Sequence, residues 1–197
     1  MEFGRGREIF SENDPGTSFY ILVAGRVKIY KLSAEGREQI LHILGPGEPF
    51  GEAAVFAGSN FPASAVALTG SRVFFIPRDP FVELINRMPQ LAMNIMASMS
   101  RRLKKFTGMI EALSLKEVPA RLAAHMLFLY EQDPGREEVH LNISKAQLAS
   151  LLGTIPETLS RILKKMSENG YIEVKGPRIR LLDQEGIEGL ATGMEKL

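Results

Sequence analysis

The spacing of apolar and polar positions changes character near residue 80. Before it, short apolar runs alternate with turns that contain Gly and Pro, as in SFYILVAGRVKIYKL, REQILHIL and SRVFFIP. The turns recur about every 8–12 residues, and no helical pattern separates the runs. Many short strands without crossover helices indicate an antiparallel sandwich or jelly-roll barrel, which we assign to residues 1–86.

One long helix is predicted next, because residues 89–114 have no interior Pro and carry a single apolar stripe at spacings of three and four. The stripe consists of Ile95, Met99, Leu103, Phe106, Ile110 and Leu113. At about 1.5 Å per residue this helix is too long to be covered by a small barrel alone. The pattern therefore favours a seam between two protomers, with packing on its own domain as the alternative. We assign residues 87–114 to this dimerisation helix.

The last third of the chain predicts a helix from residue 120, a short strand, two further helices joined by a tight turn, and the hairpin YIEVKGPRIRLLD. Helices that end in a two-stranded wing are typical of a winged helix–turn–helix, which we assign to residues 115–197. The predicted fold class is α+β: an N-terminal antiparallel jelly-roll barrel, a long dimerisation helix and a C-terminal winged helix–turn–helix.

The turn between the two helices carries specific local chemistry. Ser144 is a good N-cap for the first helix, and Gly153 permits the positive φ that ends it. Thr154 and Glu157 match the capping box S/T-x-x-E of the second helix. Pro156 in its first turn removes no intrahelical hydrogen bond, because amides there have no helical partner.

The exposed face of the second helix has the chemistry of a base reader. Glu157, Ser160 and Arg161 lie near its N-terminal end. A guanidinium can donate two hydrogen bonds to guanine, and a carboxylate can accept one from cytosine. The alternatives are a mutual salt bridge between Glu157 and Arg161, or a capping role for Glu157.

Residues 144–182 carry a local excess of about four positive charges, although the whole chain has a formal net charge of only +1. We expect the DNA phosphates to meet Ser144, Thr158, Lys164, Lys165, Lys175 and Arg178.

Composition narrows the function further. The chain has 197 residues, 45% of them hydrophobic, and no Cys, which excludes disulfides, thiolate zinc sites and cysteine-ligated iron–sulfur clusters. It lacks an apolar run of membrane-spanning length and a signal peptide, so we expect a cytoplasmic protein without a membrane partner. A single His in the barrel cannot build a cupin-type metal site, and no nucleophile or phosphate-loop motif occurs, so we expect no enzyme activity.

The chain resembles the CRP/FNR family of bacterial transcription regulators over almost its whole length. The matching stretches are GREIFSENDPGTSFYILVAGRVKIY, GPGEPFGEAAVFAG and ISKAQLASLLGTIPETLSRIL. The resemblance implies a homodimer on double-stranded DNA, with RNA polymerase as a further partner and a longer segment before GREIF. ETLSR looks like the FNR-type reading triad, which assigns base contacts to Glu157, Ser160 and Arg161. It implies a two-fold palindrome of TTGA-type half-sites about one helical turn apart.

The resemblance also suggests where an effector would bind. It places the effector pocket at Gly51, Glu52, Ala53, Pro62, Ala63 and Ser64. In the cyclic-nucleotide branch an Arg and a Ser hold the cyclic phosphate where this chain has Pro62 and Ala63. Without that Arg, a buried phosphate would lack its compensating charge, so we do not expect cyclic AMP.

GTIPETLSR together with FPASA looks most like the nitric-oxide or nitrosative-stress branch, which implies a small-molecule or gas effector and haem as a candidate cofactor. The imidazoles available are His42, His125 and His140, and only His42 lies in the sensor, so it is the candidate axial ligand, with a structural role as the alternative. Two other functions remain open: a cyclic-nucleotide-responsive regulator, and a barrel-plus-helix protein-interaction module that does not bind DNA.

Overall fold

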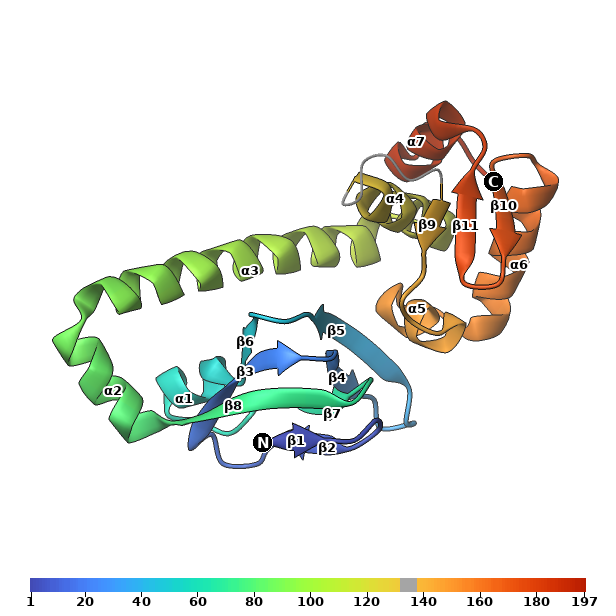
Figure 1. Ribbon diagram of the computed structural model, residues 1–197. Helices are drawn as coiled ribbons and strands as arrows, with labels where there is room; N and C mark the ends of the chain where they lie inside the picture. Colours follow the sequence, from blue (N-terminus) through green and yellow to red (C-terminus); the bar gives the residue numbers. More distant parts are fainter. Residues whose placement is uncertain (132–137) are drawn as a thin grey trace. The chain divides into compact units, whose positions relative to one another are not determined.

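The computed structural model describes residues 1–131 and 138–197, and of residue 105 it describes the backbone only. The described chain forms two compact units, Met1–Arg102 and Leu103–Leu197. The division falls inside a long helix, so that helix contributes residues to both units (Figure 1).

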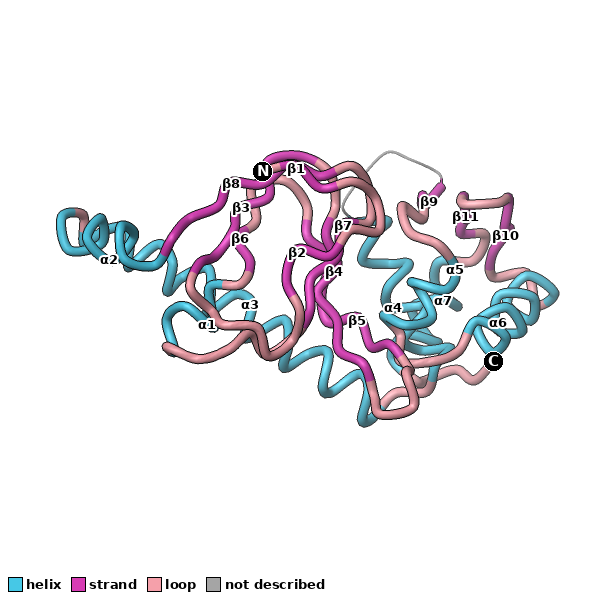
Figure 2. The backbone as a smooth tube through the Cα atoms, turned by 90° about the horizontal axis from the view of Figure 1, so that it is seen from below, coloured by secondary structure: helices cyan, strands magenta, loops and turns pink. Residues whose placement is uncertain are grey.

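The first unit contains two antiparallel four-stranded sheets, with strand orders β1-β8-β3-β6 and β2-β7-β4-β5 (Figure 2). The strands are β1 (Glu2–Phe3), β2 (Glu8–Phe10), β3 (Ser18–Ala24), β4 (Val27–Leu32), β5 (Glu38–Leu44), β6 (Pro49–Phe50), β7 (Ser64–Ala67) and β8 (Ser71–Pro77). The helices are α1 (Glu52–Ala57), α2 (Arg78–Arg87) and α3 (Pro89–Leu115). This architecture confirms the predicted jelly-roll sandwich.

The core of the barrel lies between its two sheets. Alternate residues of each strand point inward, so that Leu22 and Phe50 from one sheet meet Val27, Leu44 and Ala65 from the other. A second cluster, formed by Phe19, Val55, Phe81 and their neighbours, lies where α1 and α2 cover the outer side of β3.

A separate helix, α2, precedes the long helix α3. It ends at Arg87, and Met88 lies between the two helices. Met88 has φ −132° and ψ 75°, outside the helical region. It precedes Pro89, whose ring disfavours helical geometry in the residue before it. The boundary that we predicted after residue 86 therefore falls one residue before the end of α2.

The exposed apolar face of α3 differs from the predicted apolar stripe at one position, Ile95. Ile95 packs against the outer barrel cluster of its own unit and is partly buried there, so only part of its side chain is open to a partner. On α3, Met93 and Leu115 are exposed apolar residues, at 57% and 80% exposure. Three more, Met96, Leu103 and Ile110, at 52%, 68% and 64% exposure, recur every seven positions. Their spacing of seven was hidden in the sequence because Ile95 and Met96 fit a helical stripe equally well.

The second unit has a core of buried residues from four helices, α4 to α7, and from the strands β10 and β11 of a small sheet with the order β10-β11-β9. Its elements are α4 (Val118–Glu131), β9 (Glu138–His140), α5 (Lys145–Leu151), α6 (Pro156–Glu168), β10 (Ile172–Lys175), β11 (Arg178–Leu181) and α7 (Gln184–Thr192). The predicted winged helix–turn–helix is confirmed. The sequence did not predict α7, which is capped by Asp183 and packs on α4.

The capping box that we predicted for α6 is wrong. The N-cap is Ile155, which makes no side-chain capping hydrogen bond, and Pro156 is the first helical residue. A cap at Thr154 would require a helical Ile155, and the following Pro disfavours that conformation. Ile155 is instead extended, with φ −105° and ψ 155°.

In the part of the chain that the structure describes, no helix combines the length and the apolar character needed to cross a membrane.

Candidate nucleic-acid interface

Hydrogen bonds at the start of α5 and in the turn between α5 and α6 fix the helix–turn–helix. The Ser144 side chain accepts from the Gln147 amide, and the Gln147 side chain accepts from the Ser144 amide, which completes a reciprocal capping box for α5. Gly153 has φ 64° in the turn, as predicted. The Thr154 amide then donates to the Ala149 carbonyl oxygen, which closes the turn before α6.

The buried stripe of α6 determines which residues it presents outward. Leu159, Leu163 and Met166 are buried in the core of the second unit. Glu157, Ser160 and Arg161 all lie on its exposed side. The hydrophobic face thus anchors the helix and leaves the three candidate base readers open to solvent.

The alternative in which Glu157 and Arg161 brace one another is not what the structure shows. In the described part of the chain, the Arg161 guanidinium has one recorded polar contact, in which Nη2 donates to Thr158 Oγ1 over 3.3 Å. No ion pair joins Arg161 to Glu157 among these residues. Thr158, which we expected at a phosphate, therefore also helps to orient the guanidinium.

The predicted phosphate contacts lie at the start of α5, on α6 and on the two strands of the wing, β10 and β11. Ser144 is exposed, but its hydroxyl already caps α5. On α6, Lys164 Nζ lies 3.6 Å from Glu168 Oε1, and Lys165 Nζ donates to the Leu197 carbonyl oxygen over 2.8 Å. Lys175 and Arg178 face one another across the wing, on β10 and β11.

The predicted effector residues do not share one environment. Glu52 and Ala63 are buried, Gly51 and Ser64 are partly buried, and the other two, Ala53 and Pro62, are exposed. The residues at positions 62 and 63 offer no side-chain donor for a phosphate. Ser64 Oγ accepts from the Glu12 amide over 2.8 Å, so its hydroxyl is already engaged.

One residue of this region was missed by sequence reasoning. Arg102 of α3 forms an ion pair with Glu52, whose side chain is only 7% exposed, and its Nη2 donates to the Pro49 carbonyl oxygen over 2.6 Å. Burial raises the pKa of Glu52, and the charge of Arg102 acts in the opposite direction. The two residues lie fifty positions apart, and no local pattern connects them.

His42 has a structural partner in the barrel. Its Nε2 lies 3.0 Å from Glu48 Oε1, and Glu48 Oε2 accepts from the Gly45 amide over 2.6 Å. To bind iron through Nε2, His42 would have to give up its contact with Glu48. Among the described residues no three His, Cys, Asp or Glu side chains cluster as ligands of a bare metal ion, a finding that does not bear on haem, whose iron needs only an axial side chain from the protein.

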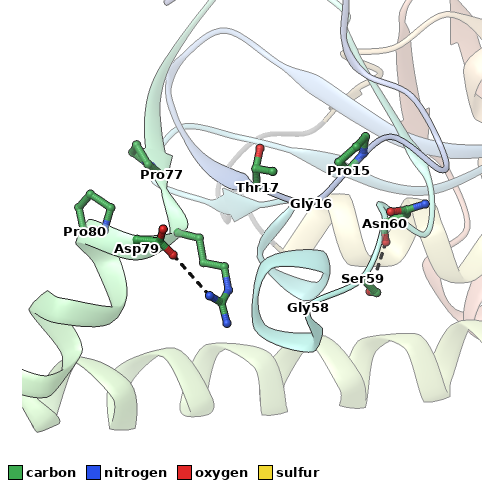
Figure 3. Close-up of a pocket in the computed structure, with 10 residues that line it drawn as sticks. Pro15, Gly16, Thr17, Gly58, Ser59, Asn60, Pro77, Asp79 and Pro80 are labelled. Atoms are coloured by element: carbon green, nitrogen blue, oxygen red, sulfur yellow. Dashed lines mark hydrogen bonds and ion pairs between the residues drawn. The ribbon is translucent and has the colours of Figure 1, made fainter.

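A surface cavity of about 370 Å³ opens elsewhere on the first unit (Figure 3). Residues 15–17 and 58–60, together with the junction of β8 and α2 at residues 77–80, line it. Arg78 Nη1 lies 3.4 Å from Asp79 Oδ1, and Arg78 Nε donates to the Val55 carbonyl oxygen over 3.2 Å. None of the predicted effector residues lines this cavity.

A jelly-roll barrel joined by a long helix to a winged helix–turn–helix defines a DNA-binding protein with a sensor-type domain. Residues 1–88 match the cyclic nucleotide-binding domain, and residues 120–190 match the Crp-like helix-turn-helix domain.

Proteins similar to this chain come from several bacteria. The chain is 30% identical to the CRP-like cAMP-activated global transcriptional regulator of Mycobacterium tuberculosis, over 94% of this chain and 84% of that protein. It is 33% identical to the electron transport regulator A of Shewanella oneidensis, over 95% of this chain and 76% of that protein.

Among solved structures, that of FixK2 from Bradyrhizobium japonicum has a TM-score of 0.83 at 25% identity, over 96% of this chain and 95% of that one. The chain belongs to the CRP/FNR family of transcription regulators, which are not enzymes. Family members bind DNA and are dimeric, and the relatives found here include both cAMP-activated regulators and others.

Proposed function

We propose that this regulator acts as a homodimer whose two α6 helices read a two-fold palindrome of TTGA-type half-sites about one helical turn apart. The supporting observation is the exposed, mutually unpaired arrangement of Glu157 and Arg161 at the start of a helix whose other face is buried. In each half-site Arg161 donates to O6 and N7 of a guanine, and Glu157 accepts from N4 of a cytosine. Ser160 contacts a neighbouring base of the half-site.

Selection from a random duplex library tests the proposed function directly. We expect the bound pool to converge on an inverted repeat, and affinity for that repeat to fall steeply with salt, because several phosphates are contacted. A barrel-plus-helix interaction module would enrich no sequence and would show no binding with that salt dependence.

We propose, first, that the effector is a small molecule or gas other than cyclic AMP. We propose, second, that RNA polymerase is the partner of this regulator at the promoter. Pro62 and Ala63 support the first part, because neither side chain can donate a hydrogen bond or a positive charge to a cyclic phosphate. Two relatives are named for cyclic AMP, so titration of the protein with cyclic AMP is the necessary comparison. Haem stays a prediction, to be tested by haemin titration with His42→Ala as the control.

The helix α3 offers a physical route from effector to DNA, because it runs unbroken through the division between the two units. An effector that binds one arrangement of the two protomers more tightly shifts the population toward that arrangement. If DNA prefers the same arrangement, effector and DNA bind cooperatively, and each raises the affinity of the other by the same factor.

The seam between protomers is proposed to run along one face of α3. With Ile95 excluded, the apolar residues Met96, Met99, Leu103, Phe106, Ile110 and Leu113 alternate at spacings of three and four. This is the a/d repeat of a coiled coil, and Leu103 and Ile110 are more than 60% exposed in the single chain.

Replacing Leu103 by Glu is expected to convert the dimer into monomers, because two carboxylates would face one another in an apolar seam. Size exclusion with light scattering measures the mass. Lys104→Glu is the matched control, since it places a carboxylate one residue further along α3, outside the repeat. An unchanged dimer in Leu103→Glu would remove this face as the seam.

A further inference from the structure

The wing presents two rows of charged residues on one face of its sheet. The strand pairing sets Lys175, Arg178 and His140 side by side in one row across β10, β11 and β9. Glu173, Arg180 and Glu138 form a second row two residues away. Because alternate residues of a strand point to the same face, both rows share one side of the sheet. The row between them, which includes the buried Val139 and Ile179, faces the core.

The two carboxylates of the second row, Glu173 and Glu138, form ion pairs with basic residues of the wing. Lys175 Nζ lies 2.7 Å from Glu173 Oε1. Glu138 contacts two arginines, Arg178 at 3.9 Å and Arg180 at 3.6 Å. The hydrogen bond from Lys175 lowers the pKa of Glu173, so this carboxylate remains charged at neutral pH.

This arrangement differs from that of the base-reading arginine. Arg161 on α6 contacts only a neutral hydroxyl within the described residues, whereas Lys175 and Arg178 each face a carboxylate of the same chain. The residue expected to read sequence is thus unneutralised, while the two wing residues expected to meet phosphate already have an anionic partner.

We propose that Glu173 and Glu138 compete with DNA phosphate for the cations of the wing, and so reduce the sequence-independent part of DNA affinity. The inference rests on the proposed function, in which this wing contacts the DNA backbone. A phosphate that approaches Lys175 must share it with a carboxylate that stays nearby. Fewer counterions are then released from the DNA on binding, and the gain in affinity from that contact is smaller.

The test is Glu173→Gln, which keeps the shape of the side chain and removes its charge. We expect binding to become about 1.5- to 5-fold tighter for each half-site, the range that corresponds to an exposed ion pair. The plot of log affinity against log salt should become steeper by about 0.9 for each protomer, or about 1.8 for the dimer, because one further cation becomes available in each half-site. The gain should be the same on the selected palindrome and on a scrambled duplex, because both offer the same phosphates. Glu138→Gln should act in the same direction.

Glu188→Gln is the matched control, because it makes the same change in net charge on α7, where Glu188 accepts a hydrogen bond from Gln184. A second check is the double variant Glu173→Gln/Lys175→Ala, in which the gain should disappear. Thermal melting followed by circular dichroism confirms that each variant is folded.

The outcomes separate the inference from the proposed function. If the unmodified protein binds duplex DNA and Glu173→Gln binds no tighter, or no tighter than Glu188→Gln, the competition is absent and the inference fails alone. If the unmodified protein binds no duplex even at low salt, the proposed function fails, and the inference fails with it.

Discussion

Replacing Arg161 by Ala is expected to cost about 1–3 kcal/mol of binding free energy in each half-site and to relax the preference at one base pair. In a symmetric dimer both half-sites lose the contact, so the loss on the full palindrome is larger than on a single half-site. The physical reason is specific: a guanidinium gives two directed hydrogen bonds to one base edge, and Ala gives none. Fluorescence anisotropy with the selected palindrome and with single-base variants of it measures both effects.

Lys164→Ala is the control for this prediction, since Lys164 is also exposed on α6 and is assigned to phosphate. It should weaken binding by a similar factor on every duplex and make the salt dependence shallower. If Arg161→Ala also weakened binding equally on all sequences, Arg161 would be a phosphate contact and the reading assignment would be lost.

Single and combined substitutions of Glu157 and Arg161 test whether these two base-reading residues act independently. The structure shows no ion pair between Glu157 and Arg161 in the residues it describes. Their substitutions should therefore have additive effects on the stability of the free protein, within about 0.5 kcal/mol. A larger coupling in a double-mutant cycle would indicate the salt bridge that the structure does not show.

The sequence predicted the DNA-binding unit well because its determinants are local. Helix α6 is defined by a buried stripe at spacings of three and four, and the turn before it by a glycine that needs a positive φ. One local error, the capping box at Thr154, arose because the motif was matched without the constraint that Pro156 places on Ile155.

Contacts between residues far apart in the chain could not be predicted from the sequence pattern. Whether Ile95 or Met96 faces outward depends on the barrel surface against which α3 packs, and that surface is formed by strands and helices far away in the chain. The pairing of Arg102 with Glu52 likewise depends on the folded path of the barrel. The effector region, which is built from such contacts, was therefore predicted less completely than the reading head.

Arg102→Met is expected to destabilise the first unit by about 3–5 kcal/mol at neutral pH, the usual cost of leaving a buried charge without its partner. Glu52 is 5% exposed, so little water reaches the carboxylate whose guanidinium partner is removed. Burial already raises the pKa of Glu52, and removing Arg102 takes away the main influence that lowers it. Urea unfolding of the full chain measures the loss, and hydrogen exchange of β3 and β8 assigns it to the barrel.

The stability lost in Arg102→Met should depend on pH, and the raised pKa of Glu52 sets the direction of that dependence. A carboxyl group whose pKa is raised in the folded state favours folding at low pH, and that contribution is lost as pH rises through the folded-state pKa. The variant should therefore approach the stability of the unmodified protein as pH falls from 7 toward the usual range of Glu, because protonated Glu52 needs no cation.

The double variant Arg102→Met/Glu52→Gln removes both charges and should recover much of the loss at neutral pH. Equal destabilisation of the single and double variants at every pH would mean that the lost packing of the Arg102 side chain, and not the unpaired carboxylate, is responsible. Recovery in the double variant would show that the charge pair, rather than shape alone, joins the long helix to the barrel.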